Sequence, residues 1–406
     1  MVERKEYLAK LWEWKDEQII KVVTGIRRCG KSVLLEQFKD RLHLAGVEAE
    51  QIISINFEDL EFEELLDYKV LYRYIKERLY SDKMTYIFLD EIQNVPDFPK
   101  VVDSLYVKNN TDVYITGSNS YLLSSELATL LSGRYVEISM LPLSFREYVT
   151  VTGRPQEDAF SEYMQTGGLP YVAVMNRTDE KVNQYLEGIY NTVIVKDIEE
   201  RQARKEKDAG KRKITDIALL KTIARYLASV IGSPISMKSV TDYLISSGRK
   251  ISPNTVSDYV EALIESFVFY PAERFDIVGK QLLKANKKLY MVDLGLRNHI
   301  LPRKRYDLGF SIENIVYFEL LRRGYKVNIG KFGSTEVDFV AQKQGILTYY
   351  QVTANMTAEE TFEREMRPLR GIQDNYEKIV LTLDRFSLGN YEGIKVMNVI
   401  DWLLGI

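Results

Sequence analysis

A glycine-rich segment near the amino terminus carries the residue types best suited to holding phosphate groups. It lies between two apolar runs and has the pattern G-x-x-x-x-G-K-[ST], which predicts a phosphate-binding loop, or P-loop. The glycines allow backbone N–H groups to turn inward, and a helix starting here would direct its positive end at the same point. We expect Lys31 to reach the β- and γ-phosphates and Ser32 to hold Mg²⁺. The residues expected to contact the nucleotide are Gly25, Ile26, Arg27, Arg28, Cys29, Gly30, Lys31, Ser32 and Val33.

Two carboxylates follow an apolar run downstream of this loop. The residues from Tyr86 to Leu89 predict a strand, which ends in Asp90 and Glu91. Beside a P-loop, Asp90 would belong to the Mg²⁺ shell, and Glu91 would orient or deprotonate the attacking water. The alternative is an ordinary buried strand with a solvated acidic end. The P-loop upstream favours the catalytic interpretation.

A further apolar strand at 113–116 also ends in small polar residues. If this strand lies between the P-loop strand and the strand before Asp90, its end would stand next to the water and the γ-phosphate. Ser118 or Asn119 is then the expected sensor of the γ-phosphate, and the sequence does not choose between them.

Composition sets broad limits on the protein. The chain has 406 residues and a formal net charge of −3, so we expect two or three domains and no overall basic field for nucleic acid. Its single cysteine, Cys29, excludes an intramolecular disulfide and favours a cytoplasmic protein. A thiol at a helix start has a lowered pKa, so a redox switch at Cys29 is one alternative and a loop position without a redox role is the other. His43 and His299 are far apart in sequence and indicate no metal cluster, and no apolar run is long enough for a membrane span.

Strands and helices alternate through the first part of the chain. After a helix within 1–18, we expect strands at 19–23, 51–57, 86–89, 113–116 and 135–140, separated by helices at 33–45, 68–80, 98–108 and 124–132. This alternation is typical of an α/β fold with a parallel sheet between helices. The first helix either covers the adenine or belongs to the core.

Arg134 stands between a predicted helix and a predicted strand. Its guanidinium could stabilise the charge on a γ-phosphate in the site of a neighbouring subunit. It could equally be a surface arginine that caps a helix end, and the sequence leaves both alternatives open.

Five motifs occur together in this chain: Gly-Ile-Arg-Arg-Cys-Gly-Lys-Ser (25–32), Phe-Leu-Asp-Glu-Ile-Gln (88–93), Thr-Gly-Ser-Asn-Ser (116–120), Leu-Ser-Gly-Arg (131–134) and Leu-Pro-Leu-Ser-Phe-Arg-Glu-Tyr (141–148). The combination resembles a family of bacterial and archaeal AAA-type ATPases, P-loop NTPases that carry a C-terminal domain of unknown function. The resemblance implies binding of ATP with Mg²⁺, ATP hydrolysis and a homo-oligomer. The segment from Gly167 to Pro170 is similar to the Gly-x-Pro motif of STAND-like (signal-transducing) and archaeal ATPases, which implies that Gly168 and Pro170 contact nucleotide from a helical lid.

We expect four domains: an AAA-like P-loop ATPase core at 1–154, a helical lid and linker at 155–213, a winged helix-turn-helix at 214–300, and an α/β domain at 301–406. The winged-helix interpretation, from three helices and a hairpin, makes DNA a candidate partner. Against it, Asp258, Glu261 and Glu265 lie on the outward face of the third helix, where carboxylates repel phosphates. The alternative is a module for protein interaction or oligomerisation.

The last domain has an α-β-β-β-α-β order that resembles restriction-endonuclease-like nucleases of the PD-(D/E)xK type. Glu313 matches the helix carboxylate of those nucleases and Asp338 the strand aspartate. The next strand should offer Glu-x-Lys, but this chain has Gln351 and Thr353. A neutral amide is a poor Mg²⁺ ligand, and threonine cannot supply the cation that activates water. We therefore predict a degenerate nuclease fold that could still bind nucleic acid or protein.

The sequence as a whole predicts an Mg²⁺-dependent ATP hydrolase whose use is open between three hypotheses. ATP turnover is coupled to DNA binding or remodelling, or it serves a STAND-like nucleotide switch that acts through protein contacts. An active nuclease is the least favoured of the three.

Overall fold

The computed structural model describes residues 2–117, 131, 133–193, 198, 216–301 and 308–406. The chain forms two compact units, Met1–Pro142 with Glu265–Phe267 and Leu143–Ile264 with Val268–Ile406. Each unit has its own sheet. None of the helices within the described ranges is both long and apolar enough to cross a membrane.

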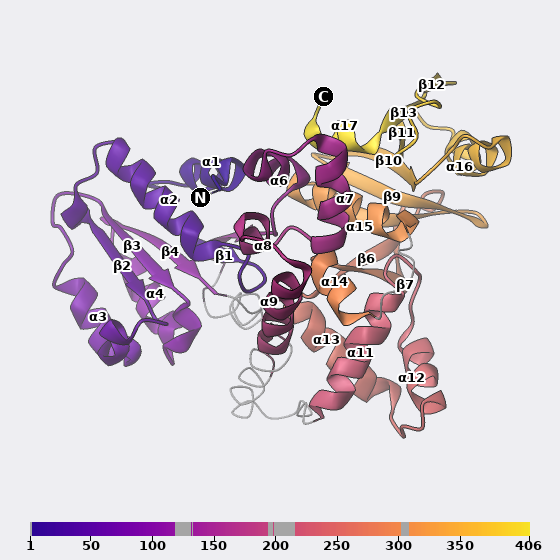
Figure 1. The fold of residues 1–406 in the computed structure, drawn as a ribbon. Coiled ribbons are helices and arrows are strands. Elements are labelled where there is room, and N and C mark those ends of the chain that lie inside the picture. Colours follow the sequence, from indigo (N-terminus) through magenta and orange to yellow (C-terminus); the bar gives the residue numbers. More distant parts are fainter. Residues whose placement is uncertain (1, 118–130, 132, 194–197, 199–215, 302–307) are drawn as a thin grey trace. The chain divides into compact units, whose positions relative to one another are not determined.

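The first unit is built on a five-stranded parallel sheet with the order β2-β3-β4-β1-β5 (Figure 1). Because all strands are parallel, their carboxyl ends meet at one edge, where ligands bind in open α/β sheets. The strands are β1 (Ile20–Thr24), β2 (Ile52–Asn56), β3 (Thr85–Asp90), β4 (Thr111–Thr116) and β5 (Tyr135–Ser139). The helices are α1 (Lys5–Glu13), α2 (Lys31–Leu44), α3 (Tyr68–Lys76) and α4 (Phe98–Tyr106), with 3₁₀ turns η1 (Ala49–Gln51), η2 (Leu60–Leu66) and η3 (Ile92–Asn94).

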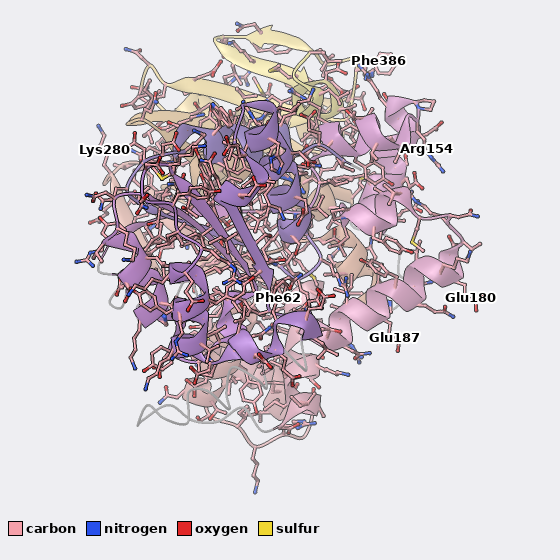
Figure 2. All side chains as sticks on the ribbon, turned by 90° about the vertical axis from the view of Figure 1, so that its left-hand side faces the viewer. Phe62, Arg154, Glu180, Glu187, Lys280 and Phe386 are labelled. Atoms are coloured by element: carbon pink, nitrogen blue, oxygen red, sulfur yellow. The ribbon has the colours of Figure 1, made fainter. Side chains whose placement is uncertain are left out.

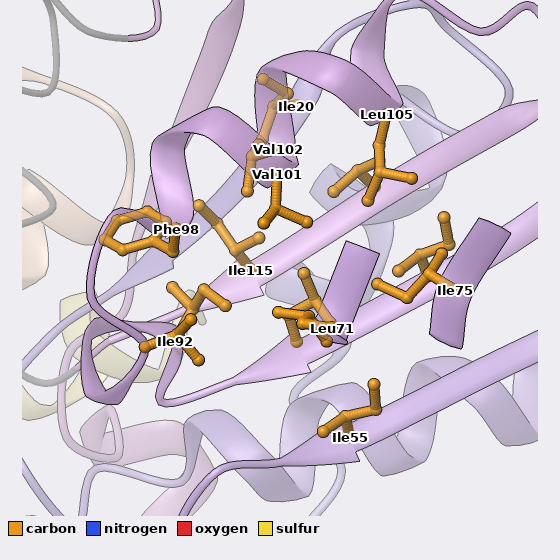
Figure 3. Close-up of a cluster of buried hydrophobic side chains, with 14 of the residues drawn as sticks. Ile20, Ile55, Leu71, Ile75, Ile92, Phe98, Val101, Val102, Leu105 and Ile115 are labelled. Carbon is orange, nitrogen blue, oxygen red and sulfur yellow. The ribbon is translucent and has the colours of Figure 1, made fainter. Parts of the chain in front are cut away.

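The central strands β1, β3 and β4 are buried on both faces, because they present apolar side chains to two layers of helices, whereas the edge strands β2 and β5 are partly exposed. On one face, α3 and α4 contribute to a cluster that includes Leu71, Phe98 and Ile115 (Figure 3). On the other face, the ring of Phe38 from α2 lies 6.3 Å from that of Phe88 and 5.1 Å from that of Tyr114. The helices cover the faces of the sheet, so that the candidate site lies at the carboxyl ends of the strands.

The second unit begins with a helical region. Its first helices are α6 (Phe145–Thr152), α7 (Gln156–Thr166), α8 (Pro170–Val174) and α9 (Asp179–Asn191). Glu180 and Glu187 project outward from α9 (Figure 2), whereas Leu186 of the same helix is buried. Later helices are α11 (Ile217–Ser229), α12 (Met237–Ser246), α13 (Pro253–Glu265) and α14 (Leu294–Ile300).

An eight-stranded mixed sheet completes the second unit, with the order β12-β13-β11-β10-β9-β8-β6-β7. Its strands are β6 (Phe269–Asp276), β7 (Gln281–Met291), β8 (Lys326–Phe332), β9 (Thr335–Lys343), β10 (Ile346–Thr353), β11 (Glu377–Thr382), β12 (Gly389–Tyr391) and β13 (Ile394–Asn398). Its helices are α15 (Leu308–Arg322), α16 (Glu359–Gly371) and α17 (Val399–Leu404). The β6–β7 hairpin belongs to this sheet because β6 pairs with β8, with Arg274 opposite Ile329.

The predicted fold class is confirmed. The first unit is a parallel sheet between helices, and the second contains the expected helical region, three helices with a hairpin, and the α-β-β-β-α-β order from α15 to β11. The sequence interpretation did not include α14, β12, β13 and α17. The helix expected at 124–132 falls outside the described residues apart from Leu131. The boundaries at 154, 213 and 300 stay predictions.

Candidate nucleotide-binding site

The turn between β1 and α2 has the backbone shape of an anion-binding loop. Gly25 has φ 143° and Gly30, directly before α2, has φ 102°. A Cβ on Gly25 would lie 2.1 Å from the carbonyl oxygen of Met140, so only glycine fits. Gly30 is the N-cap residue of α2 and has no side chain to cap the first turn. The N–H groups of this turn therefore remain suited to a phosphate.

Lys31 is buried at the first position of α2. Only 4% of the residue is exposed, and its Nζ donates to the carbonyl oxygen of Gly25 at 3.2 Å. The same Nζ lies 3.8 Å from Glu91 Oε1. The ammonium is thus held between the loop and the carboxylate expected to activate water.

Ser32 and Asp90 meet across the sheet edge. The pKa of Asp90 is raised by burial, while hydrogen bonds from the Ser32 and Thr116 hydroxyls oppose the shift. A serine hydroxyl and one carboxylate are the protein groups that hold Mg²⁺ in P-loop NTPases, where phosphate oxygens and water complete the shell. The donor set of Ser32 and Asp90 fits this ion.

Glu91 is fixed in an unusual backbone conformation. Its φ is 54°, in the left-handed region that a residue with a side chain seldom adopts. Gln93 Nε2 donates to Glu91 Oε2 at 2.5 Å, and the backbone N–H of Glu91 donates to Thr116 Oγ1 at 3.0 Å. Strain of this kind collects at functional sites, where neighbouring contacts impose it. The carboxylate is thus oriented on both sides, by Gln93 and by Lys31.

Thr116, at the end of β4, is a site residue that the sequence interpretation missed. Its Oγ1 donates to Asp90 Oδ1 while accepting from the Glu91 backbone. The sequence interpretation took β4 to lie between β1 and β3 only as a condition, and the structure meets that condition. That order was the available signal, since parallel pairing sets the last residue of β4 beside the end of β3. Ser118 and Asn119, the predicted sensors, lie outside the described residues.

The remaining loop residues divide between core and surface. Ile26 and Cys29 are buried, Arg27 Nη1 donates to Glu58 Oε1 at 2.8 Å, and Arg28 and Val33 are exposed. The lowered pKa considered for Cys29 is wrong, because burial raises the pKa of this thiol. A redox role through a reactive thiolate therefore has no support at this position.

Arg4 braces the loop from the amino terminus and was also missed. It is 2% exposed, and its guanidinium donates to the carbonyl oxygens of Cys29 at 3.2 Å and Leu141 at 2.8 Å. Nothing in the sequence pattern around Arg4 marks it, because its partners are remote in the chain. On α1 itself, Tyr7 and Leu11 are buried, which favours the core alternative for this helix.

Arg134 lies at the other end of the sheet from the P-loop of its own subunit. It precedes β5, and its carbonyl oxygen accepts from the backbone N–H of Ile20, the first residue of β1. The P-loop follows the last residue of β1, about 13 Å along the strand. The side chain contacts α4: its Nη1 lies 3.7 Å from Asp103 Oδ1, and its guanidinium lies over the ring of Tyr106. Within one chain Arg134 is therefore a surface residue, and its role in a neighbouring site stays a prediction.

In the second unit, Gly168 lies in the turn between α7 and α8. Pro170 starts α8, and the Gly168 backbone N–H donates to Asp293 Oδ2 at 2.7 Å. Asp293, directly before α14, was not singled out from the sequence. The contact of Gly168 and Pro170 with nucleotide stays a prediction.

The carboxylates of the nuclease-like domain surround a lysine that the sequence interpretation did not consider. Lys288 Nζ, from β7, lies 3.1 Å from Glu313 Oε1 and 2.7 Å from Glu336 Oε1. Burial works to lower the pKa of Lys288, but the carboxylates of Glu313, Asp338 and Glu336 outweigh it, so the pKa is raised. The ammonium thus holds the position between carboxylates that a divalent cation would need, and no described group of three or more His, Cys, Asp or Glu is arranged for a metal ion.

Gln351 takes part in the same region as a hydrogen-bonding group. Its Oε1 accepts from the Asp338 backbone at 3.3 Å, and its Nε2 donates to Glu365 Oε2 at 2.9 Å. Both the oxygen and the nitrogen of the amide are hydrogen-bonded. Gln351 therefore has a structural role at the position where the nuclease motif has a metal-binding glutamate.

Comparison with known proteins gives matches over most of the chain. Residues 17–149 match the family model described as "AAA domain", and residues 157–307 match "Domain of unknown function (DUF8612)". An uncharacterized protein of Haemophilus influenzae is 40% identical over 100% of this chain and 99% of its own length. The uncharacterized protein MJ1544 of Methanocaldococcus jannaschii is 29% identical over 94% of this chain and 85% of its own. Among solved structures, the Walker-type ATPase PABY2304 of Pyrococcus abyssi is similar, with 17% identity, a TM-score of 0.48, and coverage of 74% of this chain and 96% of that one.

Proposed function

The chain belongs to a family of AAA-type P-loop ATPases that carry a domain of unknown function, and from that premise we propose that it binds ATP and hydrolyses it with Mg²⁺. The proposal rests on the position of Lys31, Asp90 and Glu91 at the P-loop. All three side chains are buried, and an ion pair and hydrogen bonds fix their orientation. Charge stabilisation and positioning are the main requirements of phosphoryl transfer, and this site offers both.

Each residue has a distinct task in the proposed reaction. Lys31 and the loop N–H groups offset the negative charge of the phosphates. Ser32 and Asp90 would hold Mg²⁺, and this ion would withdraw charge from the phosphate oxygens. Glu91 orients a water molecule and accepts its proton as the oxygen attacks the γ-phosphorus in line with the leaving oxygen. Thr116 fixes the Asp90 carboxylate and the backbone of Glu91, since it donates to the first and accepts from the second. Ser118 or Asn119 would sense the γ-phosphate.

A homo-oligomer is part of the proposal because Arg134 points away from the P-loop of its own chain. Its guanidinium lies on the surface beside α4, which supports the proposal that it acts in the site of a second copy. A guanidinium supplied in this way would stabilise charge on the transferring phosphoryl group. Hydrolysis would change the lid around Gly168 and Pro170. The cytoplasmic location predicted from composition stays a prediction.

We propose DNA as the partner that ATP turnover serves, on the basis of three helices followed by a hairpin. Lys280 is exposed at the tip of that hairpin (Figure 2), and Lys250 is exposed before α13. The STAND-like switch acting through protein contacts is the second candidate. It is favoured by the acidic Glu261, exposed on α13, and by Arg249, whose Nη1 pairs with Asp216 Oδ2 at 2.6 Å. Nuclease activity ranks last, because Lys288 occupies the space between the carboxylates.

The first test combines nucleotide binding and turnover. Glu91→Gln should bind ATP with an unchanged Kd while turnover falls by about 10² or more, because the acceptor for the proton of water is removed. Lys31→Ala should weaken ATP binding. Wild-type turnover in Glu91→Gln would show that another group activates the water.

The second test separates the two partners. Turnover is measured with duplex, single-stranded and branched DNA at low and moderate salt. Stimulation that depends on DNA form and falls with salt supports the DNA hypothesis. Measurable basal turnover that no DNA changes supports the protein-signalling switch.

A further inference from the structure

One buried carboxylate joins the lid motif to α14. Asp293 Oδ2 accepts from the Gly168 N–H at 2.7 Å, and Oδ1 accepts from the Leu296 N–H at 3.0 Å. The backbone N–H groups of Leu169 and Gly295 also donate to this carboxylate. Asp293 is 3% exposed. A single side chain therefore satisfies amides at the start of α8 and in the first turn of α14.

Close backbone packing surrounds this carboxylate. A Cβ on Gly167 would lie 2.2 Å from Asp293 Oδ1, and a Cβ on Gly295 would lie 2.1 Å from the carbonyl oxygen of Thr166. Asn298 Nδ2 donates to the carbonyl oxygens of Met164 and Gln165 at 2.9 and 3.0 Å. The last turn of α7 is thus capped by side chains of the α14 segment. We refer to Asp293, Gly295 and Asn298 with these partners as the α7–α14 interlock.

The interlock continues into the three-helix module. Arg297 of α14 is 6% exposed, and its Nε donates to the carbonyl oxygen of Ala228 at the end of α11 at 2.9 Å. Met291, at the end of β7, exchanges two hydrogen bonds of 2.9 Å with the side chain of Asn314. Helix α14 is therefore bonded to the lid helix α7 on one side and to α11 on the other.

We propose that Asp293 is a positioning residue that makes the lid and the α11–α13 module move as one body. A change at Gly168 and Pro170 would then pass through α14 to α11, although the sequence predicts a linker near residue 213 that separates these parts. The proposal rests on the proposed function, because it needs nucleotide to act on the lid. It goes further because it names Asp293 as the residue that transmits the change in the lid to α11–α13, the helices proposed to bind DNA.

Hydrogen exchange of backbone amides tests the coupling in the full chain, in the Glu91→Gln background so that ATP stays bound. Without ATP, the amides of Gly168 and Leu169 should be protected, and Asp293→Asn should lower their protection by about tenfold or more, since an amide side chain cannot accept four N–H groups. With ATP, exchange should change in both the lid and α11–α13. In Asp293→Asn, saturating ATP should alter exchange in the lid only.

A matched control and a milder variant complete the test. Asp384→Asn also removes a carboxylate that accepts backbone amides, with Phe386 N at 2.7 Å, but lies outside the interlock, so the response of α11–α13 should persist. If Asp293→Asn fails to fold, Asn298→Ala can be used instead. It removes two hydrogen bonds to α7 and should reduce, but not abolish, the change in α11–α13 exchange that ATP causes. A full α11–α13 response in either interlock variant overturns the proposal, as does ATP binding to the parent protein without any response in α11–α13. If ATP does not bind at all, the proposed function itself fails, and the interlock inference falls with it.

Discussion

Replacing Gly25 by alanine isolates the contribution of loop shape to nucleotide binding. The new Cβ would lie 2.1 Å from the carbonyl oxygen of Met140, about 0.9 Å inside the 3.0 Å that real Cβ contacts respect. The φ of 143° adds strain, because residues with a side chain rarely adopt it. Strain at such a position is about 1–3 kcal/mol. The loop can relieve it only by moving away from Met140.

The assay is the Kd for ATP, measured by titration with a fluorescent ATP analogue. In the variant, the loop must regain about 2 kcal/mol of strain to adopt the shape that binds phosphate. The Kd for ATP should therefore rise roughly thirtyfold. Gly153→Ala is the matched control. Gly153 also has a positive φ, of 62°, but a Cβ added there would meet no atom within 4 Å, so its cost of about 1 kcal/mol should lower the melting temperature and leave the Kd unchanged. A Kd in Gly25→Ala within twofold of wild type would refute the view that this backbone shape holds the phosphates.

Three further predictions concern charged groups. Arg134→Ala should lower turnover of the assembled protein by about 10³, while the melting temperature changes little because the pair with α4 is half exposed. Lys288→Met should destabilise the second unit by about 3–5 kcal/mol, because buried carboxylates lose their cation, whereas Lys395→Met breaks an exposed pair and should cost under about 1 kcal/mol; denaturant unfolding measures both. Burial raises the pKa of Asp293 to about 6, against hydrogen bonds from backbone N–H groups that lower it. The folded protein then binds more protons than the unfolded chain between about pH 4 and 6, so up to about 3 kcal/mol of stability is lost as pH rises through this window; melting curves of wild type and Asp293→Asn should show this slope in the wild type only.

Each of these predictions has a result that contradicts it. Unchanged ATP turnover in the assembled Arg134→Ala variant would exclude a role of Arg134 in a neighbouring site and leave it a surface residue. Equal losses of stability in Lys288→Met and Lys395→Met would mean that burial does not distinguish the two pairs. If the difference in stability between wild type and Asp293→Asn stays flat from about pH 4 to 7, Asp293 titrates in its ordinary range.

The parts predicted well from sequence are those fixed by local pattern. The P-loop region, the strand before Asp90 and the alternation of helices and strands depend on residues close in the chain, so glycine spacing and apolar periodicity were enough. The position of β4 between β1 and β3 was considered from the sequence only as a condition, and the observed sheet order meets it.

The missed residues act through partners that are distant in sequence. Arg4 meets Leu141, and Lys288 meets Glu313 and Glu336, only after the chain has folded. Thr116 was passed over because two later residues looked equally suitable. A lone arginine or lysine in an unremarkable segment gives no periodic signal, so these contacts could not be found by reading along the chain.

The shared sheet of the second unit has a practical consequence for producing its parts separately. Strand β8 is paired with β9 on one side and with β6 on the other. A fragment beginning near residue 301 would lack β6 and β7 and would expose the backbone of β8 as an open edge, which invites aggregation. The nuclease-like part should therefore be expressed together with the hairpin, and through evolution the two are expected to be inherited, exchanged or lost as a pair.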